Sequence, residues 1–211
     1  MRLPRDLFLP IIAMSLVVII SNILVQFLLG NWLTWGAITY PLAFLITDLT
    51  NRFYGKNAAR LVVLFGFIIG VFCSFIGTQI YGEFGPLITF RVAIGSALAF
   101  LIAQLLDVSI FHRFRNTNWW KAPLISSFLG SSIDTILFFF IAFSATCIFL
   151  DPSNDVSWAL EKTPIIGFFG VAPLWVSLAL SDFLVKISLV SLSLIPFRIL
   201  IMSRRVRAKI L

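Results

Sequence analysis

The sequence predicts an all-α integral membrane protein: a bundle of six transmembrane helices with both termini in the cytoplasm, formed by residues 1–211 as a single domain. Hydrophobic residues make up 60% of the chain and charged residues 12%, whereas soluble domains are about half apolar and about a quarter charged. Apolar runs of around 20 residues, long enough to cross ~30 Å of hydrocarbon, recur along the chain. A soluble core of this length could not bury so much apolar surface.

Six apolar runs define the predicted spans. We place them at Phe8–Leu29, Gly36–Asn51, Ala59–Tyr81, Leu87–Phe111, Pro123–Leu150 and Ala172–Leu200. The first is a retained span and not a signal peptide, because its apolar run is too long and no small-residue cleavage site follows it. Pro41 lies within the second span and is expected to kink it.

Lysine and arginine residues in the connections predict the orientation, because cytoplasmic loops are enriched in them. They gather at the N-terminus, after the second and fourth spans and in the C-terminal tail, as Arg2, Arg5, Arg52, Lys56, Arg60, Arg113, Arg115, Lys121, Arg204, Arg205, Arg207 and Lys209. The alternate connections contain one basic residue, Lys162. Both termini are therefore expected in the cytoplasm. The net charge of +7 follows from this bias, and since the charges are scattered over loops and a short tail, we expect no nucleic-acid partner.

Several classes of function lack their parts in this sequence. There is no Gly-rich phosphate loop for ATP hydrolysis, and His112 is the only histidine, so a His-ligated metal site or a Ser/His intramembrane protease is not expected. Cys73 and Cys147 lie inside predicted spans without ligand-like spacing and are expected to pack as small hydrophobic residues. We therefore expect no enzymatic activity, no metal and no cofactor.

Six ionisable side chains fall within the predicted spans, where each costs about 2.5–3.5 kcal/mol near a helix centre. They are Asp48, Arg91, Asp107, Asp134, Asp182 and Lys186. Such charges usually face the bundle interior or a water-filled cavity and mark a substrate or ion pathway. Because acids outnumber bases in this set, we favour a functional role over purely structural ion pairs.

Asp134 and Asp182 are the deepest of these charges, near the middle of the fifth and sixth spans. Lys186 follows Asp182 at i+4 and shares its helix face, either as an ion pair that fixes helix register or as part of a site. Small residues at four-residue spacing mark inward faces, and Ser126, Gly130 and Asp134 form such a stripe. A stripe that ends in a carboxylate indicates a crevice with an acid inside. Uncharged polar groups at similar depths are Asn22, Gln104 and Ser131.

The other interior charges lie nearer the span ends. Asp48 precedes Arg52 by four residues, a spacing that favours an interfacial ion pair. Arg91 begins the fourth span at the outer face, where its guanidinium could snorkel to the headgroups. Asp107 has no basic residue one turn away and needs a partner from another helix. We assign Asp48, Arg52, Arg91 and Asp107 to gating or coupling. The alternatives are an interfacial Asp48–Arg52 pair and a snorkelling Arg91.

Five segments resemble the queuosine precursor transporter family, also called the vitamin uptake transporter-like family. They are TWGAITYPLAFLITDLTNRFYG (34–55), AQLLDVSIFHRFR (103–115), WWKAP (119–123), LGSSIDTILFFFIAF (129–143) and SDFLVK (181–186), and they match in order and spacing. The resemblance implies a six-span protein of the bacterial inner membrane that imports 7-deazaguanines. The substrates it implies are 7-cyano-7-deazaguanine and its aminomethyl relative, salvaged to make queuosine in tRNA.

The resemblance gives the interior acids a role. A deazaguanine presents a ring N–H beside an exocyclic amine, and a carboxylate can accept both in a bidentate pair. Asp134 is the first choice for this role and Asp182 the second. The rest of the substrate-binding set is Lys186, Ser131, and Asn22 and Gln104 for the carbonyl and pyrrole edges. Ser131 stands where an asparagine often follows this glycine in the family, which leaves the preferred deazaguanine open.

Two other classes of function remain as alternatives. A substrate-binding subunit of an energy-coupling-factor importer is also small and six-spanned, but the first span lacks a clean Ala-x-x-x-Ala face for docking a coupling subunit. A non-transporting membrane scaffold would tolerate replacement of the buried acids. The lipid bilayer is the expected surrounding, and a homo-oligomer, the coupling ion and the role of Pro164–Pro173, as a re-entrant or an interfacial segment, stay open.

Overall fold

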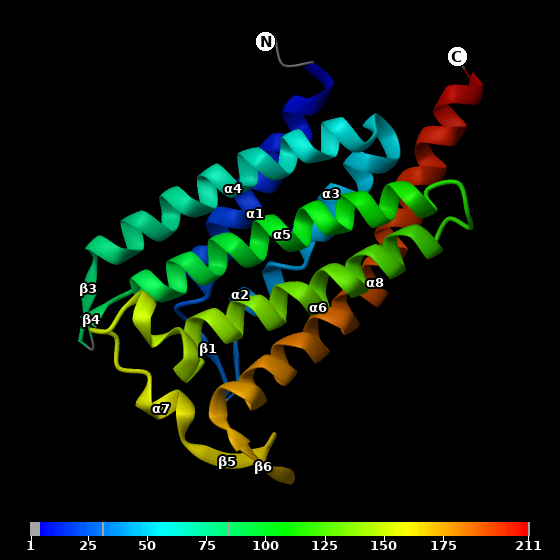
Figure 1. The fold of residues 1–211 in the computed structure, drawn as a ribbon. Coiled ribbons are helices and arrows are strands. Elements are labelled where there is room, and N and C mark those ends of the chain that lie inside the picture. The colour runs from blue at the N-terminus through cyan, green and yellow to red at the C-terminus, as the bar shows by residue number, and fades with distance from the viewer. Residues whose placement is uncertain (1–4, 31, 84, 211) are drawn as a thin grey trace.

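The computed structural model describes residues 5–30, 32–83 and 85–210 and is mostly helical (Figure 1). Arg2 of the basic N-terminus lies outside these ranges. The main helices are α1 (Phe8–Leu24), α3 (Leu42–Tyr54), α4 (Lys56–Gln79), α5 (Phe90–Phe114), α6 (Lys121–Phe143) and α8 (Leu174–Ile210). Short helices are the 3-10 turns Arg5–Leu7 and Ala145–Leu150, α2 (Gly36–Thr39) and α7 (Ser157–Leu160).

Within the described residues, four helices are long and apolar enough to cross a membrane: α4, α5, α6 and the Leu174–Ser203 part of α8. The predicted first span is shorter as a helix, because α1 has 17 residues and ends at Leu24. The predicted second span is divided into α2 and α3 at Tyr40–Pro41. Pro41 was expected to disturb this helix, because proline lacks the N–H that continues the hydrogen-bond ladder.

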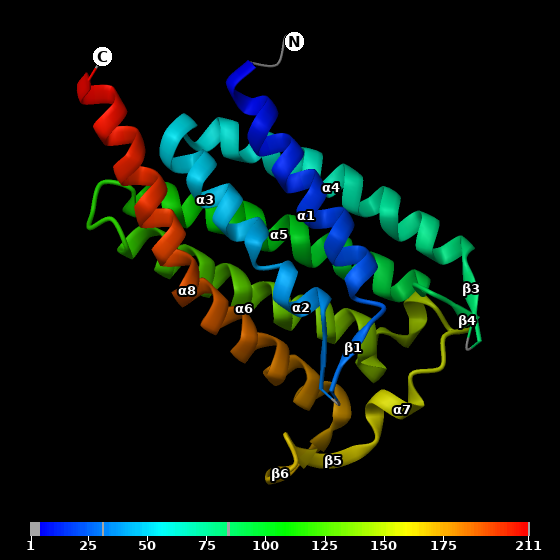
Figure 2. The ribbon, with the colours of Figure 1, turned by 180° about the vertical axis from the view of Figure 1, so that it is seen from behind.

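The helices form one bundle with two distinct ends. The α5 helix packs against α6 and α4, α8 packs against α6, and α1 packs against α4. Figures 1 and 2 show that α1 begins and α8 ends at the same end, together with the α3–α4 and α5–α6 connections. We call this the terminal end. The opposite end carries short strand pairs, and we call it the hairpin end.

Three two-stranded antiparallel hairpins correct the all-α prediction in the connections. They are β1 (Leu28–Leu29) with β2 (Leu33–Thr34), β3 (Tyr81–Gly82) with β4 (Gly85–Pro86), and β5 (Lys162–Ile165) with β6 (Phe169–Pro173). Pairing of the strands gives hydrogen-bond partners to backbone N–H and C=O groups that lie outside the helices. The predicted re-entrant or interfacial segment 164–173 is thus a hairpin, and Gly167 with φ +83° makes its turn possible.

Two helix boundaries also differ from the sequence prediction, the first of them because of local capping. The predicted fifth span reached Leu150, but α6 ends at Phe143, and Ser144 Oγ accepts a hydrogen bond of 3.2 Å from Thr146 N to open a 3-10 turn. The α8 helix continues beyond the predicted Leu200 to Ile210. A hydroxyl cap of this kind ends one helix and starts the next without leaving the backbone N–H unsatisfied.

Small residues let the helices approach closely, as the predicted stripes require. Gly66 leaves room for Met14, since a Cβ there would lie 2.7 Å from Met14 Cγ. Gly130 leaves room for the ring of Phe44, 2.7 Å from its hypothetical Cβ. Many large apolar side chains point outward, such as Phe72, which is 63% exposed. An exposed surface of this kind suits lipid contact and not water.

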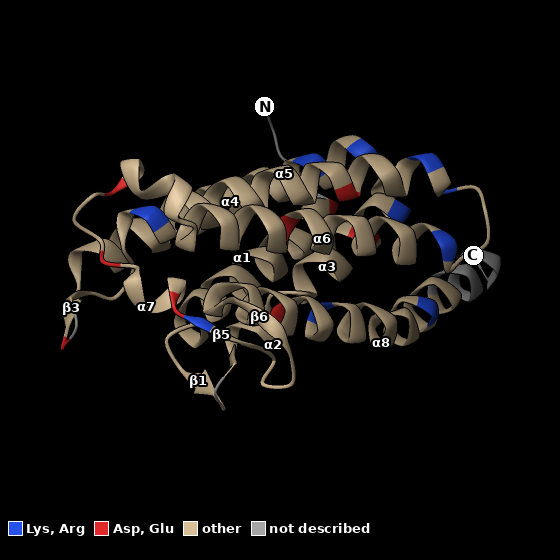
Figure 3. Cartoon of the chain, turned by 60° about the horizontal axis from the view of Figure 1, so that its bottom comes forward, with Lys and Arg blue, Asp and Glu red and all other residues tan. Residues whose placement is uncertain are grey.

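Charges are distributed unevenly along the bundle. Figure 3 shows most lysine and arginine residues towards the terminal end and the loop acids towards the hairpin end, with several acids inside the bundle. This is the asymmetry from which the sequence predicted the orientation.

Candidate functional site

A cavity of about 450 Å³ lies in the hairpin half of the bundle. Its lining runs from the β1–β2 hairpin to the middle of α6 and α8 and includes residues of α1, α2 and α5. Aromatic side chains form much of the wall, namely Trp32, Tyr40, Phe138, Phe139, Phe143 and Trp158. The volume falls in the range of small-molecule sites, roughly 300–1,000 Å³.

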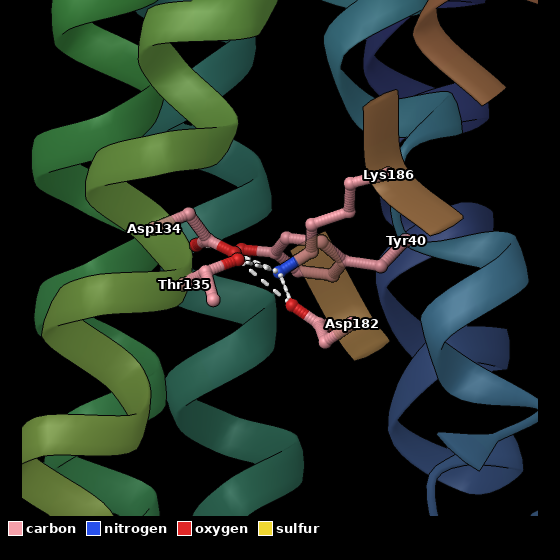
Figure 4. A network of polar contacts seen from close by, with 5 residues as sticks. All are labelled: Tyr40, Asp134, Thr135, Asp182 and Lys186. Atoms are coloured by element: carbon pink, nitrogen blue, oxygen red, sulfur yellow. Dashed lines mark hydrogen bonds and ion pairs between the residues drawn. The ribbon is translucent and has the colours of Figure 1, made fainter. Parts of the chain in front are cut away.

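A charged network lies at the inner part of this cavity. Lys186 Nζ is 2.6 Å from Asp134 Oδ2 and 2.5 Å from Asp182 Oδ2. Figure 4 shows the ammonium group between the two carboxylates, with Asp134 on α6 and both Asp182 and Lys186 on α8. The predicted i+4 pair of α8 is therefore confirmed, and Asp134 joins it from across the bundle.

Two hydroxyl groups complete the network. Thr135 Oγ1 donates to Asp182 Oδ2 at 2.8 Å, and Tyr40 OH donates to Asp134 Oδ1 at 3.1 Å. The Tyr40 ring also faces the Lys186 ammonium, with 5.4 Å from Nζ to the ring centroid. Such a cation–π contact adds about 0.5–2 kcal/mol, more where water is excluded.

The network carries more acid than base. With Asp134 and Asp182 ionised and Lys186 protonated, its net charge is −1 in an apolar surrounding. Of these three side chains, Asp182 is the most exposed, at 13%. Buried charges need partners for their remaining lone pairs. A ligand that presents adjacent N–H donors would supply such partners, and this is the chemistry the cavity can offer.

Tyr40 and Thr135 belong to the site although the sequence analysis did not select them. Tyr40 lies where the helix is interrupted, between α2 and α3, so its side chain reaches the bundle interior. A tyrosine directly before a proline in the middle of an apolar run was the signal available for it. Thr135 follows Asp134 in sequence and turns towards α8, where it bonds Asp182.

The other predicted substrate-binding residues separate into two groups. Asn22 lines the cavity, and its Nδ2 donates to Val18 O at 2.9 Å. Gln104 and Ser131 are fully buried but are not among the cavity-lining residues. Gln104 Oε1 instead accepts from Thr47 Oγ1 at 2.7 Å across the contact between α5 and α3. The structure thus places Asn22 at the cavity and the other two between helices.

Asp48 of α3 and Asp107 of α5 both contact serines of α6, away from the cavity lining. Ser127 Oγ lies 3.1 Å from Asp48 Oδ2 and 3.4 Å from Asp107 Oδ1, and Ser126 Oγ lies 3.3 Å from Asp48 Oδ1. Asp107 therefore has the partner from another helix that it was expected to need. Asp48 is only 2% exposed, and its carboxylate turns inward to the serines.

The two arginines of the predicted gating set make backbone contacts. Arg52 Nη1 donates to Arg115 O, and Arg115 Nη2 donates to Arg52 O at 2.9 Å, which ties α3 to α5. Arg91 is fully buried; its Nε donates to Ile141 O at 2.6 Å and its Nη2 to Ser144 O. The snorkelling prediction is wrong, because this guanidinium caps the last carbonyls of α6.

In the described ranges, no group of three or more His, Cys, Asp or Glu side chains is arranged to hold a metal ion. The two cysteines are free thiols, with Cys147 buried and Cys73 partly buried.

Comparison with known proteins gives a consistent set of similarities. Residues 34–201 match the family model described as "Putative vitamin uptake transporter". The "Queuosine precursor transporter" of Escherichia coli (strain K12) is 39% identical over 142 residues, which cover 61% of this chain and 64% of that protein. No solved structure matches.

Two further relatives carry similar names. The "Probable queuosine precursor transporter" of Haemophilus influenzae is 36% identical over 137 residues, covering 60% of this chain and 57% of the relative. The protein of the same name from Bacillus subtilis is 30% identical over 136 residues, covering 55% and 58%. The chain thus spans less than two thirds of the length of each of these relatives.

Proposed function

We propose that this chain, which belongs to the putative vitamin uptake transporter family, transports queuosine precursors across a membrane. The proposal rests on its similarity to queuosine precursor transporters, which covers more than half of the chain. In the proposal it imports 7-cyano-7-deazaguanine, 7-aminomethyl-7-deazaguanine or both across the bacterial inner membrane. The cell uses them to make queuosine in tRNA. The six spans of this proposal are α1, α2 with α3, α4, α5, α6 and α8.

The observation that carries this proposal is the charged network inside an aromatic cavity. Asp134 offers carboxylate oxygens to the ring N–H and exocyclic amine of a deazaguanine, in the bidentate pairing that suits adjacent donors. The Tyr40 hydroxyl, which now occupies Asp134 Oδ1, would yield that oxygen to the substrate. Lys186 keeps Asp134 ionised and in place at 2.6 Å.

The shape of the cavity also supports a planar bicyclic substrate. Phe138 and Phe139 line the cavity, and the indole of Trp158 packs edge-on against Phe143 with ring centroids 5.5 Å apart. Aromatic walls stack on a purine-like base whatever its exact substituents. The polar groups then select among bases, since a site built for donors rejects a base that lacks them.

The position of the cavity supports import. If the basic terminal end lies in the cytoplasm, as the enrichment of lysine and arginine there favours, the cavity lies in the half of the bundle that faces outside. The structure would then be a state that receives substrate from outside. Release to the cytoplasm requires rearrangement at the terminal end, where Arg52 and Arg115 tie α3 to α5.

The proposed function is tested in cells that can neither make nor import the deazaguanine precursors but keep the later steps that convert them to queuosine in tRNA. Expression of the chain should produce uptake of labelled 7-cyano-7-deazaguanine and the appearance of queuosine in tRNA. The Asp155→Asn variant, altered in an exposed loop, should behave as the wild type does. Absence of uptake for both deazaguanines, with the protein present in the membrane at normal levels, would overturn the proposal.

A further inference from the structure

A second polar centre lies within the bundle, apart from the cavity. It consists of Asp48 on α3, Asp107 on α5 and the hydroxyls of Ser126 and Ser127 on α6. None of these four residues lines the cavity. All four are 3% exposed or less, so water does not satisfy them from the surface.

The hydrogen bonds at this centre do not satisfy two ionised carboxylates. Ser127 Oγ is within reach of both Asp48 Oδ2 (3.1 Å) and Asp107 Oδ1 (3.4 Å), but a hydroxyl carries one hydrogen and donates to one acceptor at a time. Asp107 Oδ2 is buried without a hydrogen-bond partner among the described residues. The two carboxylates thus lie within reach of the same serine hydroxyl.

Several basic side chains of the surrounding helices contact other groups. Arg52 of α3 and Arg115 after α5 donate to each other's backbone carbonyls. Lys186 of α8 contacts Asp134, Asp182 and Thr135. Lys121 of α6 lies over the Trp120 ring and Arg198 of α8 over the Trp119 ring, while Arg60 of α4 and His112 and Arg113 of α5 are exposed. The hydrogen bonds of the described residues bring no basic side chain to Asp107.

Two carboxyl groups that share a buried site do not both ionise readily, because the second charge is repelled by the first and is poorly solvated. A proton shared between them removes the repulsion and supplies the missing donor for Asp107. We propose that the Asp48–Asp107 pair is a proton-binding site that couples transport to the proton gradient. The coupling part rests on the proposed function, whereas the proton site itself does not.

The α6 helix connects this site to the cavity. It carries Ser127 at the acid pair and Asp134 in the cavity, with Gly130 between them. A Cβ at Gly130 would lie 2.7 Å from Phe44 Cε1 and 3.4 Å from Asp107 Cβ. Because packing here is so close, movement of α6 on substrate binding is transmitted to the acid pair. The pair takes a proton from the outer side and releases it when the terminal end opens.

Transport by purified protein in liposomes tests the coupling. With acid outside, the wild type should accumulate labelled 7-cyano-7-deazaguanine about tenfold for each unit of pH difference if one proton is coupled, and a protonophore should abolish this. Asp48→Asn and Asp107→Asn should lose the accumulation but keep exchange of internal for external substrate. The Asp155→Asn control should keep both activities.

Infrared spectroscopy tests the proton site without any substrate. The wild type at neutral pH should show the carbonyl stretch of a buried protonated carboxylic acid, and Asp48→Asn and Asp107→Asn should lose it. Asp134→Asn should retain it, since Lys186 holds Asp134 ionised. Persistence of the band in both pair variants, or accumulation that follows a sodium gradient and ignores protonophore, would overturn the proposal. If the wild type neither takes up nor exchanges deazaguanines, the proposed function fails while the infrared result still decides the proton site.

Discussion

At the scale of single residues, the site depends on one ammonium group between two carboxylates. Lys186 is 4% exposed, and its Nζ contacts Asp134, Asp182 and Thr135. Removing one partner of a buried ion pair costs more than the pair gains, because it leaves an uncompensated charge. The three side chains therefore differ sharply in how well the protein tolerates their loss.

Lys186→Ala should be the most destabilising of these changes, by about 3–5 kcal/mol, because it leaves two buried carboxylates without a cation. Asp182→Asn should cost only about 1 kcal/mol, since Lys186 still pairs with Asp134. The measurement is thermal unfolding of protein purified in detergent. Adding Asp134→Asn and Asp182→Asn to Lys186→Ala should restore stability but not uptake. A Lys186→Ala variant as stable as the wild type would contradict the ion network.

Asn22 and Gln104 were predicted for the same role, and the structure separates them. Asn22→Ala should raise the KM for uptake about threefold to tenfold with stability retained, as the loss of about 0.5–1.5 kcal/mol from a hydrogen bond implies. Gln104→Ala should lower stability and leave KM unchanged, because Gln104 bonds Thr47 outside the cavity. Uptake kinetics at matched expression distinguish them, and equal KM effects would contradict this assignment.

The sequence alone predicted the charged centre of the site, but not its full membership. A carboxylate is so costly inside an apolar span that Asp134, Asp182 and Lys186 were conspicuous. Tyr40 was not, because a tyrosine is common in apolar segments. Its hydroxyl is recognised as part of the site only when its hydrogen bond to Asp134 on another helix is seen. Ser131 was misplaced for the opposite reason: its depth was right, but its direction depends on helix rotation, which polar depth does not determine.

At the scale of elements, close helix contacts depend on small residues at regular spacing. The α6 stripe of Ser126, Gly130 and Asp134 is buried, as its four-residue spacing predicted. On α5, Gly95, Ala99, Ala103 and Asp107 are buried at the same spacing. The connections were less predictable. Hairpin strands as short as these have little hydrophobic pattern, so periodicity could not distinguish them from loops.

Gly130→Ala tests one of the close contacts between helices. The added methyl would meet the ring of Phe44 at 2.7 Å, and a buried ring in close packing moves less easily than the end of a flexible side chain. We expect a loss of stability of about 1–3 kcal/mol by overpacking. Gly170→Ala, where nothing lies within 4 Å, should change stability by less than about 0.5 kcal/mol. Equal thermal stability of the two purified variants would contradict the packing of α3, α5 and α6.

At the scale of the whole molecule, the distribution of charge predicts the orientation of the bundle in the membrane. The ends of α1 and α8, the α3–α4 turn and the α5–α6 connection share one end, and the three hairpins share the other (Figures 1 and 2). The alternation of basic and acidic connections along the sequence predicts this grouping, because each span reverses the direction of the chain. The alternation does not predict that the second span is interrupted at Tyr40–Pro41; the signal for that break is Pro41 itself.

Single cysteines at exposed positions near the two ends of the bundle test the orientation, after Cys73 and Cys147 are replaced by alanine. Asn57→Cys and Asn116→Cys lie at the terminal end and should be shielded from an impermeant thiol reagent in intact cells. Ser153→Cys, at the hairpin end, should react. Permeabilised cells should expose all three positions, which are exposed in the structure. Labelling of Asn116→Cys from outside would contradict the six-span arrangement with cytoplasmic termini.

Recognition of the donor edge of a deazaguanine by Asp134 is central to the proposed function, and its most direct test is uptake of 7-cyano-7-deazaguanine by Asp134→Asn at matched expression. This variant should insert normally, because Lys186 keeps Asp182 as its partner at 2.5 Å. Uptake should fall by one to three orders of magnitude, since losing a charged hydrogen bond and gaining a donor–donor contact costs roughly 1.5–4 kcal/mol. Uptake by Asp134→Asn at the wild-type rate and affinity would contradict this role for Asp134.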